Sequence, residues 1–232
     1  MGWSVNRPTG LTYHRRGLST KGYTLLTPHG DTASYLIDID GCVVHRWIFS
    51  HIKPGYGRLL DNGNLLMTGS DIDMPKPPKD EPTKPPPPLD RHVTRLGGYH
   101  TTLAEVDWDG NVVWKFRHYE RIQDGRRKAR WMARQHHDYQ REGNPVGYYA
   151  PGMEPLLAGG NTLILCHKNV SHKGISEKPI LDDTFIEVSW EGKVIWEWLC
   201  SDHFDELGFD EFAVNDIVSD FPFISVSFPP SE

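Results

Sequence analysis

The chain has 232 residues, of which 38% are hydrophobic and 11% aromatic, enough for one globular domain with a buried core or for two small ones. Its formal net charge of −6 argues against a general nucleic-acid-binding protein, because such proteins carry a basic surface. Three cysteines (Cys42, Cys166 and Cys200) are too few and too scattered for a disulfide framework or a Cys-x-x-Cys site.

The first 20 residues are polar and basic and include Pro8 and Gly10, which predicts a loosely held arm over residues 1–20. No apolar run follows the basic start, so the segment lacks the pattern of a secretory signal. No stretch of the chain reaches the length of apolar sequence that a membrane-spanning helix needs. We therefore expect a cytoplasmic protein with no membrane partner.

Beyond residue 20, one hairpin pattern occurs three times. Each copy has β-rich runs on both sides of an acidic residue and a glycine, at Asp40-Gly41, Asp109-Gly110 and Glu191-Gly192. The second and third residues after each glycine are β-branched, and the sixth is aromatic. Such a pair between two β-rich runs is a strong short-range hairpin signal. The expected hairpins cover residues 35–47, 103–116 and 185–198.

A second pattern, a Gly-Asn pair flanked by apolar residues, occurs at residues 59–67 and again at 156–165. The two patterns alternate along the chain, and two successive hairpins make the four-stranded antiparallel sheet of a β-propeller blade. We therefore predict an all-β fold, a partial β-propeller of about 2.5–3 blades over residues 21–199. Its complete blade cores are expected at residues 57–118 and 153–199, and residues 21–48 supply three strands of an earlier blade.

A closed propeller typically has about four to eight blades, which is more than this chain supplies. The chain is therefore expected to be a fragment, to close with a second copy, or to form an open wedge. Unpaired sheet edges in any open arrangement predict self-association.

Three segments do not fit the blade pattern. Residues 71–90 are rich in proline and lysine, which predicts a polyproline II or disordered linker and, as the weaker alternative, an SH3-type ligand. Residues 119–152 form an inter-blade segment whose basic run, Gly125–Arg130, could attract an anionic substrate. Residues 200–232 form a C-terminal segment with a short helix expected at 204–212.

Polar side chains are concentrated in the inter-blade stretch from Arg134 to Pro145, which includes the sequence His136-His137-Asp138. Gly143 and Pro145 predict a loop here, and loops held by a rigid scaffold often carry catalytic residues. Neighbouring residues of an extended segment point to opposite sides, so only one of the two histidines is expected to face a site. The alternative is a connector whose polar groups only satisfy one another.

The chain resembles the arylsulfate sulfotransferase family, β-propeller enzymes that move a sulfuryl group between phenols. The resemblance covers most of residues 21–212 and is carried by LLDNGNLLM, LAEVDWDGNVVWKF, HHDYQREGNPVGY, GGNTLIL and FIEVSWEGKVIWEW. It implies a six-bladed propeller, a histidine that accepts the sulfuryl group, and no external cofactor. The implied partners are phenols and aryl sulfate esters.

The resemblance also assigns roles to particular residues. His137, or else His136, would be the catalytic histidine, and Arg141 would stabilise charge on the sulfate oxygens. The expected substrate-binding residues are Arg134, Asp138, Asn144 and His167. Of these, Asp138 is expected to orient an imidazole, and His167 is included because it ends an expected strand, where channel-facing residues can lie. No metal ligands are expected, because adjacent histidines do not have the i, i+4 helical spacing of a zinc site.

Two other classes of function stay open. Later blades of the family contribute further site histidines and an arginine that this chain does not contain, so the second interpretation is a non-catalytic, propeller-like binding or scaffold module. A propeller hydrolase or lyase that uses histidine, aspartate and a metal is the weakest of the three interpretations.

Overall fold

The structure, a computed structural model, describes residues 13–28, 30–71, 102–122, 130–133, 135–144, 156–176, 179–208 and 223–224. Most of the expected N-terminal arm, the Pro-rich segment beyond Asp71, most of the basic run before Arg130, and Arg134 lie outside these residues. In the part of the chain that is described, no helix is long and apolar enough to cross a membrane.

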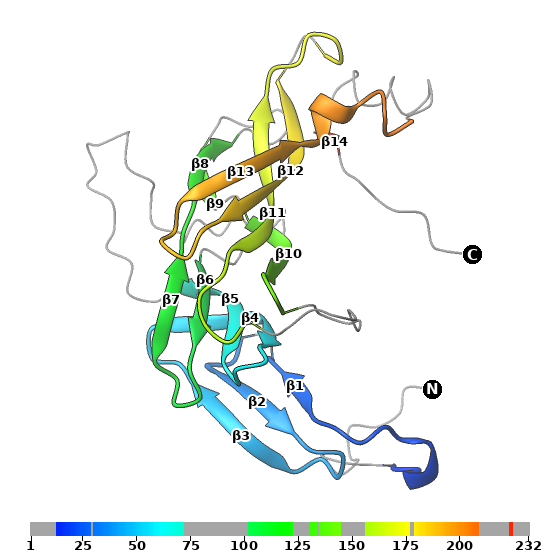
Figure 1. Ribbon diagram of the computed structural model, residues 1–232, viewed down its shortest axis with the longest axis vertical. Coiled ribbons are helices and arrows are strands. Elements are labelled where there is room, and N and C mark those ends of the chain that lie inside the picture. The colour runs from blue at the N-terminus through cyan, green and yellow to red at the C-terminus, as the bar shows by residue number, and fades with distance from the viewer. Residues whose placement is uncertain are drawn as a thin grey trace.

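The described chain is all-β, as predicted, and its strands form three main sheets that follow one another along the molecule (Figure 1). The first sheet consists of β1 (Thr24–Leu26), β2 (Ala33–Ile37) and β3 (Val43–Ile48). The second consists of β4 (Ile52–Leu59), β5 (Leu65–Asp71), β6 (Thr102–Val106) and β7 (Val112–Phe116). The third consists of β10 (Gln135–Arg141), β11 (Thr162–Val170), β12 (Ile180–Val188) and β13 (Val194–Leu199).

Smaller elements complete the architecture. β14 (Phe223–Ile224) pairs in parallel with β12, and β8 (Tyr119–Ile122) pairs with β9 (Arg130–Ala133) in a separate ribbon. Within each main sheet, strands that follow one another in the sequence are antiparallel neighbours. Among the described strands, no sheet closes on itself.

The three predicted acidic-Gly hairpins are present and connect β2 to β3, β6 to β7 and β12 to β13. Their turn glycines have positive φ, for example 90° at Gly110, a conformation that glycine adopts at little cost. At this turn the Asp107 carboxylate accepts the backbone N–H groups of Asp109 and Asn111. These bonds stabilise the turn locally, which is why the short sequence pattern was sufficient to predict it.

The third sheet begins earlier than predicted. No strand is formed by residues 156–161, and the partner of β11 is β10, which covers the stretch expected to be a loop. Gly143 ends this strand rather than interrupting it. Two of its inward-facing residues, Gln135 and Arg141, are polar, so the strand lacks the apolar alternation that would have revealed it. The expected blade core at 153–199 was therefore wrong at its start.

Contacts between successive sheets repeat with the sequence pattern. The fourth residue after the turn glycine is His45 in the first sheet and Trp114 in the second. His45 Nε2 lies 2.9 Å from the carbonyl oxygen of Trp108, and Trp114 Nε1 donates to the carbonyl of Trp190 at 2.7 Å. Each ring also stacks on the tryptophan that supplies the acceptor. The first sheet therefore meets the second as the second meets the third.

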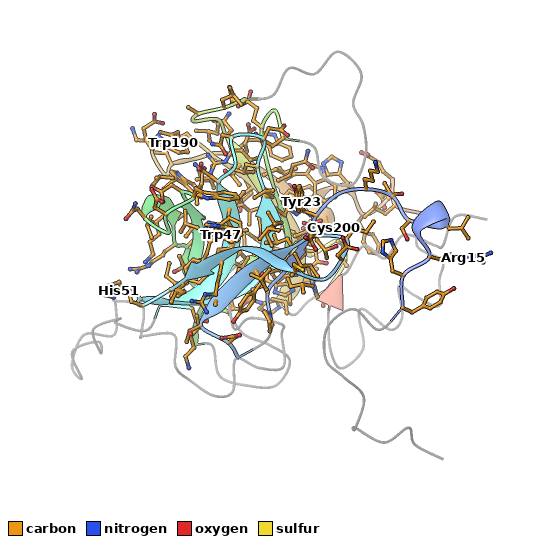
Figure 2. The ribbon with its side chains drawn as sticks, turned by 90° about the horizontal axis from the view of Figure 1, so that it is seen from below. Arg15, Tyr23, Trp47, His51, Trp190 and Cys200 are labelled. Atoms are coloured by element: carbon orange, nitrogen blue, oxygen red, sulfur yellow. The ribbon has the colours of Figure 1, made fainter. Side chains whose placement is uncertain are left out.

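The second sheet is buried on both faces. Leu65, Met67 and neighbouring side chains pack with Trp47 of the first sheet, whereas Leu66 and Leu103 pack with side chains of the third. This arrangement follows from the alternation of side chains along a strand. Seen from below, Trp47 lies among the packed sheets, and Arg15, which precedes η1 (Arg16–Leu18), lies far outside them (Figure 2).

Of the short helix expected at residues 204–212, the structure describes only residues 204–208, which are not helical. A 3-10 helix, η3 (Cys200–His203), directly follows β13, and residues 204–208 continue as turns. Asp182 fixes the start of η3, because its Oδ2 accepts both the backbone N–H and the hydroxyl of Ser201 at 3.0 and 2.7 Å.

Candidate functional site

The sequence His136-His137-Asp138 forms a bulge in β10, and these three are called the bulge residues below. Gln135 pairs with Cys166 and Tyr139 pairs with Ile164, so three residues of β10 lie opposite the single residue Leu165 of β11. His137 has a φ of 52°, which is the left-handed region and uncommon for histidine. Bulges re-aim side chains and are frequent next to active sites. The bulge changes the simple alternation that was expected of an extended segment.

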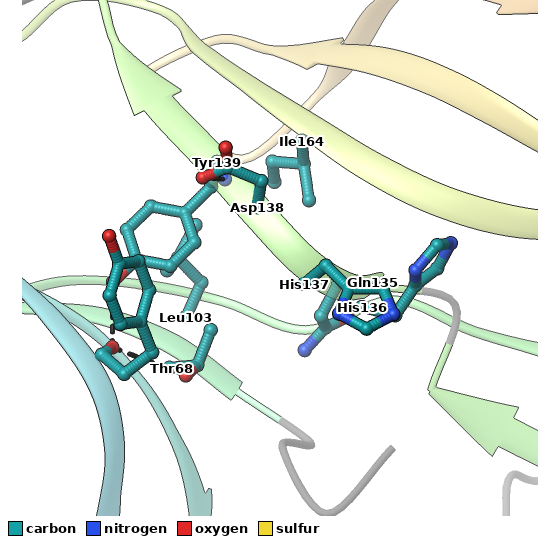
Figure 3. A pocket seen from close by; sticks show the side chains of 9 residues that line it. Thr68, Leu103, Gln135, His136, His137, Asp138, Tyr139 and Ile164 are labelled. Atoms are coloured by element: carbon teal, nitrogen blue, oxygen red, sulfur yellow. Dashed lines mark hydrogen bonds between the residues drawn. The ribbon is translucent and has the colours of Figure 1, made fainter. Parts of the chain in front are cut away.

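A pocket of about 190 Å³ lies beside the bulge, between the second and third sheets (Figure 3). Leu103, Ile164 and the rings of Tyr56 and Tyr139 give it aromatic and apolar walls. Polar groups come from Gln135, the bulge residues and Thr68. In Figure 3, the side chains of Tyr139 and Thr68 lie on one side of the pocket, with His136 and His137 on the other.

The two bulge histidines differ in their surroundings. Both line the pocket, although only one of them was expected to face a site, but His136 is buried and His137 is exposed. Their rings meet edge to face with centroids 5.0 Å apart. His137 is therefore the histidine that a molecule entering the pocket can reach first.

The tyrosine wall is fixed by hydrogen bonds and ring contacts. The Tyr139 hydroxyl shares its single proton between the carbonyl oxygens of Tyr56 and Leu66, which lie 2.7 and 3.1 Å away. The rings of Tyr56 and Tyr139 pack edge to face at 5.9 Å. Burial raises the pKa of Tyr139 far above its usual value, so the hydroxyl is a permanent donor.

Arg58 places a positive charge next to this wall. Its guanidinium lies 5.4 and 5.3 Å from the ring centroids of Tyr56 and Tyr139. It also pairs with the Asp138 carboxylate and donates to the carbonyl of Tyr139. Asp138 was expected to orient an imidazole, but its described partners are Arg58 and the backbone N–H of Tyr139.

A buried cluster lies behind the bulge and consists of His136, His167 and Asp183, called the His-Asp cluster below. The Nε2 atoms of His136 and His167 lie 3.4 and 3.2 Å from Asp183 Oδ1. The two imidazoles stack with centroids 3.7 Å apart and an angle of 13° between their planes. The three side chains come from β10, β11 and β12, and His167 faces Asp183 directly across the sheet.

The electrostatics of the His-Asp cluster favour a charged aspartate and a neutral His167. Burial acts to raise the pKa of Asp183, but the two adjacent imidazoles outweigh it and hold the pKa well below its usual value. Burial lowers the pKa of His167, and Asp183 only partly opposes this effect. The cluster thus combines a buried carboxylate with an imidazole that resists protonation.

Arg141 does not reach the pocket. It is buried between the second and third sheets, and its guanidinium lies 4.5 and 4.9 Å from the ring centroids of Trp114 and Trp190. Its Nη2 lies 3.1 Å from Glu105 Oε2. Burial lowers its pKa, and Glu105 opposes the shift. These contacts give Arg141 a role in joining the sheets.

Two of the other expected binding residues, Asn144 and His167, do not line the pocket. Asn144 is buried in the turn after β10, where it accepts the N–H of Asp61 and donates to the carbonyls of Glu142 and Leu156. His167 belongs to the His-Asp cluster and does not line the pocket. The structure therefore brings His136, His137 and Asp138 together at the pocket, adds His167 behind them, and leaves Arg141 and Asn144 elsewhere.

Sequence reasoning missed Asp183, Tyr56 and Arg58. A signal existed for Asp183, because Asp182 and Asp183 interrupt an otherwise apolar, β-rich run. Carboxylates in a buried strand need compensating partners, which makes such a pair informative. Nothing in their local sequence marks Tyr56 and Arg58, since they reach the site only through the packing of β4 against β10.

We compared the chain with models of protein families, with curated proteins and with solved structures, and none of the three comparisons gave a match.

Proposed function

We propose that this protein transfers a sulfuryl group from an aryl sulfate ester to a phenol, with His137 as the acceptor in the enzyme. The observation that supports this most directly is the exposed imidazole of His137, held by a bulge at the edge of a pocket with aromatic walls. The resemblance of the repeats and of residues 136–148 to arylsulfate sulfotransferases suggests the reaction.

The reaction would proceed in two displacements. A neutral ring nitrogen of His137 attacks sulfur, an S–N bond forms, and the S–O bond to the aryl group breaks to release a phenolate. An acceptor phenol then loses its proton to the released phenolate or to solvent, and its oxygen displaces the histidine from sulfur. The number of sulfuryl groups and protons is conserved, and no redox partner is required.

The pocket walls suit an aryl substrate. Aromatic pairs favour edge-to-face or offset contacts, and Tyr56 and Tyr139 already present such an arrangement. Arg58 lies over both rings and is the cation that we propose to act on the charge of the sulfuryl oxygens. This role replaces the one expected of Arg141.

We further propose that the three main sheets are consecutive blades of an open propeller. Support comes from the equivalent contacts of His45 with Trp108 and of Trp114 with Trp190. A regular relation between neighbours is what a repeat architecture requires, since each unit contacts only the next.

One observation favours a non-catalytic binding module as the second candidate. None of the described residues that line the pocket is lysine or arginine, and the charge of Arg58 is paired with Asp138. A sulfuryl group in transfer needs cationic donors, so the pairing of Arg58 would have to loosen when substrate binds.

The test is release of 4-nitrophenol from 4-nitrophenyl sulfate by the full chain, with and without phenol as acceptor. We expect acceptor-dependent release that is lost in His137→Asn, a substitution that removes the nucleophile but tolerates the left-handed backbone. The control is His51→Ala, which removes an exposed imidazole outside the pocket and should leave the rate unchanged. Absence of release by the folded wild-type chain would favour the binding module instead.

A further inference from the structure

The His-Asp cluster has the composition of a metal site. We propose that His136, His167 and Asp183 bind one divalent transition-metal ion of the first row, with Zn²⁺ as the reference ion. Two imidazoles and one carboxylate form a common three-residue ligand set for such ions. One ligand atom from each side chain lies within 4.8 Å of the other two.

The two distances from Asp183 Oδ1 to the histidine nitrogens match the edges of a coordination tetrahedron. Bonds of about 2.0–2.1 Å to a tetrahedral ion keep neighbouring ligand atoms about 3.3 Å apart. The two Nε2 atoms lie 3.4 and 3.2 Å from Asp183 Oδ1. An ion could therefore enter between these atoms without a large movement of the strands.

Hydrogen bonding does not explain the close approach of these atoms. Asp183 Oδ1 and both ring nitrogens of His136 are buried and have no aligned hydrogen-bond partner among the described residues. The side chains of His136 and Asp183 are only 4% and 9% exposed. Buried polar atoms without partners are costly, and a cation placed between them would satisfy a carboxylate oxygen and an imidazole nitrogen together.

The stacking of the two imidazoles predicts how the cluster responds to the ion. The lone pair of a ring nitrogen lies in the plane of its ring, and the two rings are nearly parallel at 3.7 Å. One ion cannot lie in both planes, so binding must rotate the rings out of their stack. This rotation involves side chains only, because the register of β11 and β12 is continuous through His167 and Asp183.

The neighbouring residues provide matched controls. Asp182 precedes Asp183 on β12, but its carboxylate is directed to Ser201. His137 follows His136 in the bulge, but it is exposed and lies outside the cluster. The metal inference does not rest on sulfuryl transfer, although His136 also lines the pocket and would bring the ion close to it.

The experiment is a calorimetric titration of the full chain, freed of metal with a chelator, with Zn²⁺. We expect one equivalent to bind to the wild type and to the controls Asp182→Asn and His137→Asn. In Asp183→Asn and His136→Gln, affinity should fall more than about tenfold, because loss of even an outer partner of a ligand costs about 10–100-fold. Circular dichroism of each metal-free variant shows whether it is folded.

Three results would overturn the proposal: no saturable binding by the folded wild type at micromolar Zn²⁺, unchanged affinity in both cluster variants, or equal loss in the controls. If the cluster variants do not fold, the visible spectrum of Co²⁺ added to the wild type tests the proposal instead. A visible spectrum of a tetrahedral Co²⁺ site with nitrogen and oxygen ligands supports the cluster, and a spectrum of hydrated Co²⁺ overturns it.

Discussion

The hydroxyl of Tyr139 joins β10 to the second sheet through two carbonyl oxygens, those of Tyr56 and Leu66. Replacement by phenylalanine keeps the ring but leaves both carbonyls without this donor. We expect Tyr139→Phe to lower the free energy of unfolding by about 1–3 kcal/mol, the cost of buried groups left unsatisfied. Urea denaturation near neutral pH measures this difference.

The same hydroxyl predicts a dependence on alkaline pH. Its pKa is raised in the folded chain, so the stability that it contributes is fully present below the unfolded pKa of about 10 and is lost as pH rises above that value. The difference between wild type and Tyr139→Phe should therefore shrink at about pH 11. Tyr23→Phe, at a side chain that is 68% exposed, is the control. If the difference in unfolding free energy between wild type and Tyr139→Phe stayed constant from neutral pH to about pH 11, the raised pKa of Tyr139 would be contradicted.

At the scale of elements, the end of β10 depends on Gly143. It has a φ of 68°, and a Cβ added there would lie 2.8 Å from the backbone nitrogen of Leu156. Gly143→Ala therefore combines left-handed strain of about 1–2 kcal/mol with a clash against backbone. We expect a larger loss of unfolding free energy than in Gly192→Ala, where φ is also positive but nothing lies within 4 Å. If urea denaturation showed equal losses of unfolding free energy in the two variants, the close approach of Leu156 to Gly143 would not contribute to the effect.

The elements differ in how far the sequence determines them locally. The turn at Asp109-Gly110 was predictable because its hydrogen bonds join residues within four positions of one another. β10 was not, because its buried polar residues are compensated by partners in other sheets, such as Glu105 for Arg141. The bulge is likewise visible only from the register of β10 against β11.

The candidate site also has some features that the local sequence indicates and others that depend on contacts between strands. His136, His137 and Asp138 were recognisable as an unusual concentration of polar groups, but the chain alone did not reveal that the two histidines have different environments. His167 had only a position at a strand end to recommend it, and Asp183 acquires its significance from facing His167 across the sheet. Clusters formed across strands require register, which local patterns do not contain.

At the scale of the whole molecule, the residue position that makes the contacts between sheets occurs a third time, in the third sheet. Trp196 is the fourth residue after Gly192, the position that His45 and Trp114 occupy in the two earlier hairpins. Trp114 is buried against the next sheet, whereas Trp196 is 46% exposed. Val194 and Ile195 beside it are exposed, as are the equivalent Val112 and Val113 of the second sheet, so Trp196 is the residue that distinguishes the third sheet. Among the described residues, the third sheet therefore presents an apolar strand that resembles the contact surface of the second.

This surface predicts self-association of the chain. By analogy with Trp114, Trp196 of one copy would donate its indole N–H to the carbonyl of Ile39 in another, since Ile39 occupies the position of Trp108 and Trp190 in the first hairpin. We expect the mass measured by light scattering to rise with concentration in the micromolar range. Trp196→Glu should suppress the rise, because a charge at an apolar contact is costly to bury. Tyr13→Ser, at an exposed side chain outside the sheets, should not. A monomer at every concentration would mean that the exposed apolar strand does not contact a second copy, and that the repeated contact between sheets does not extend beyond one chain.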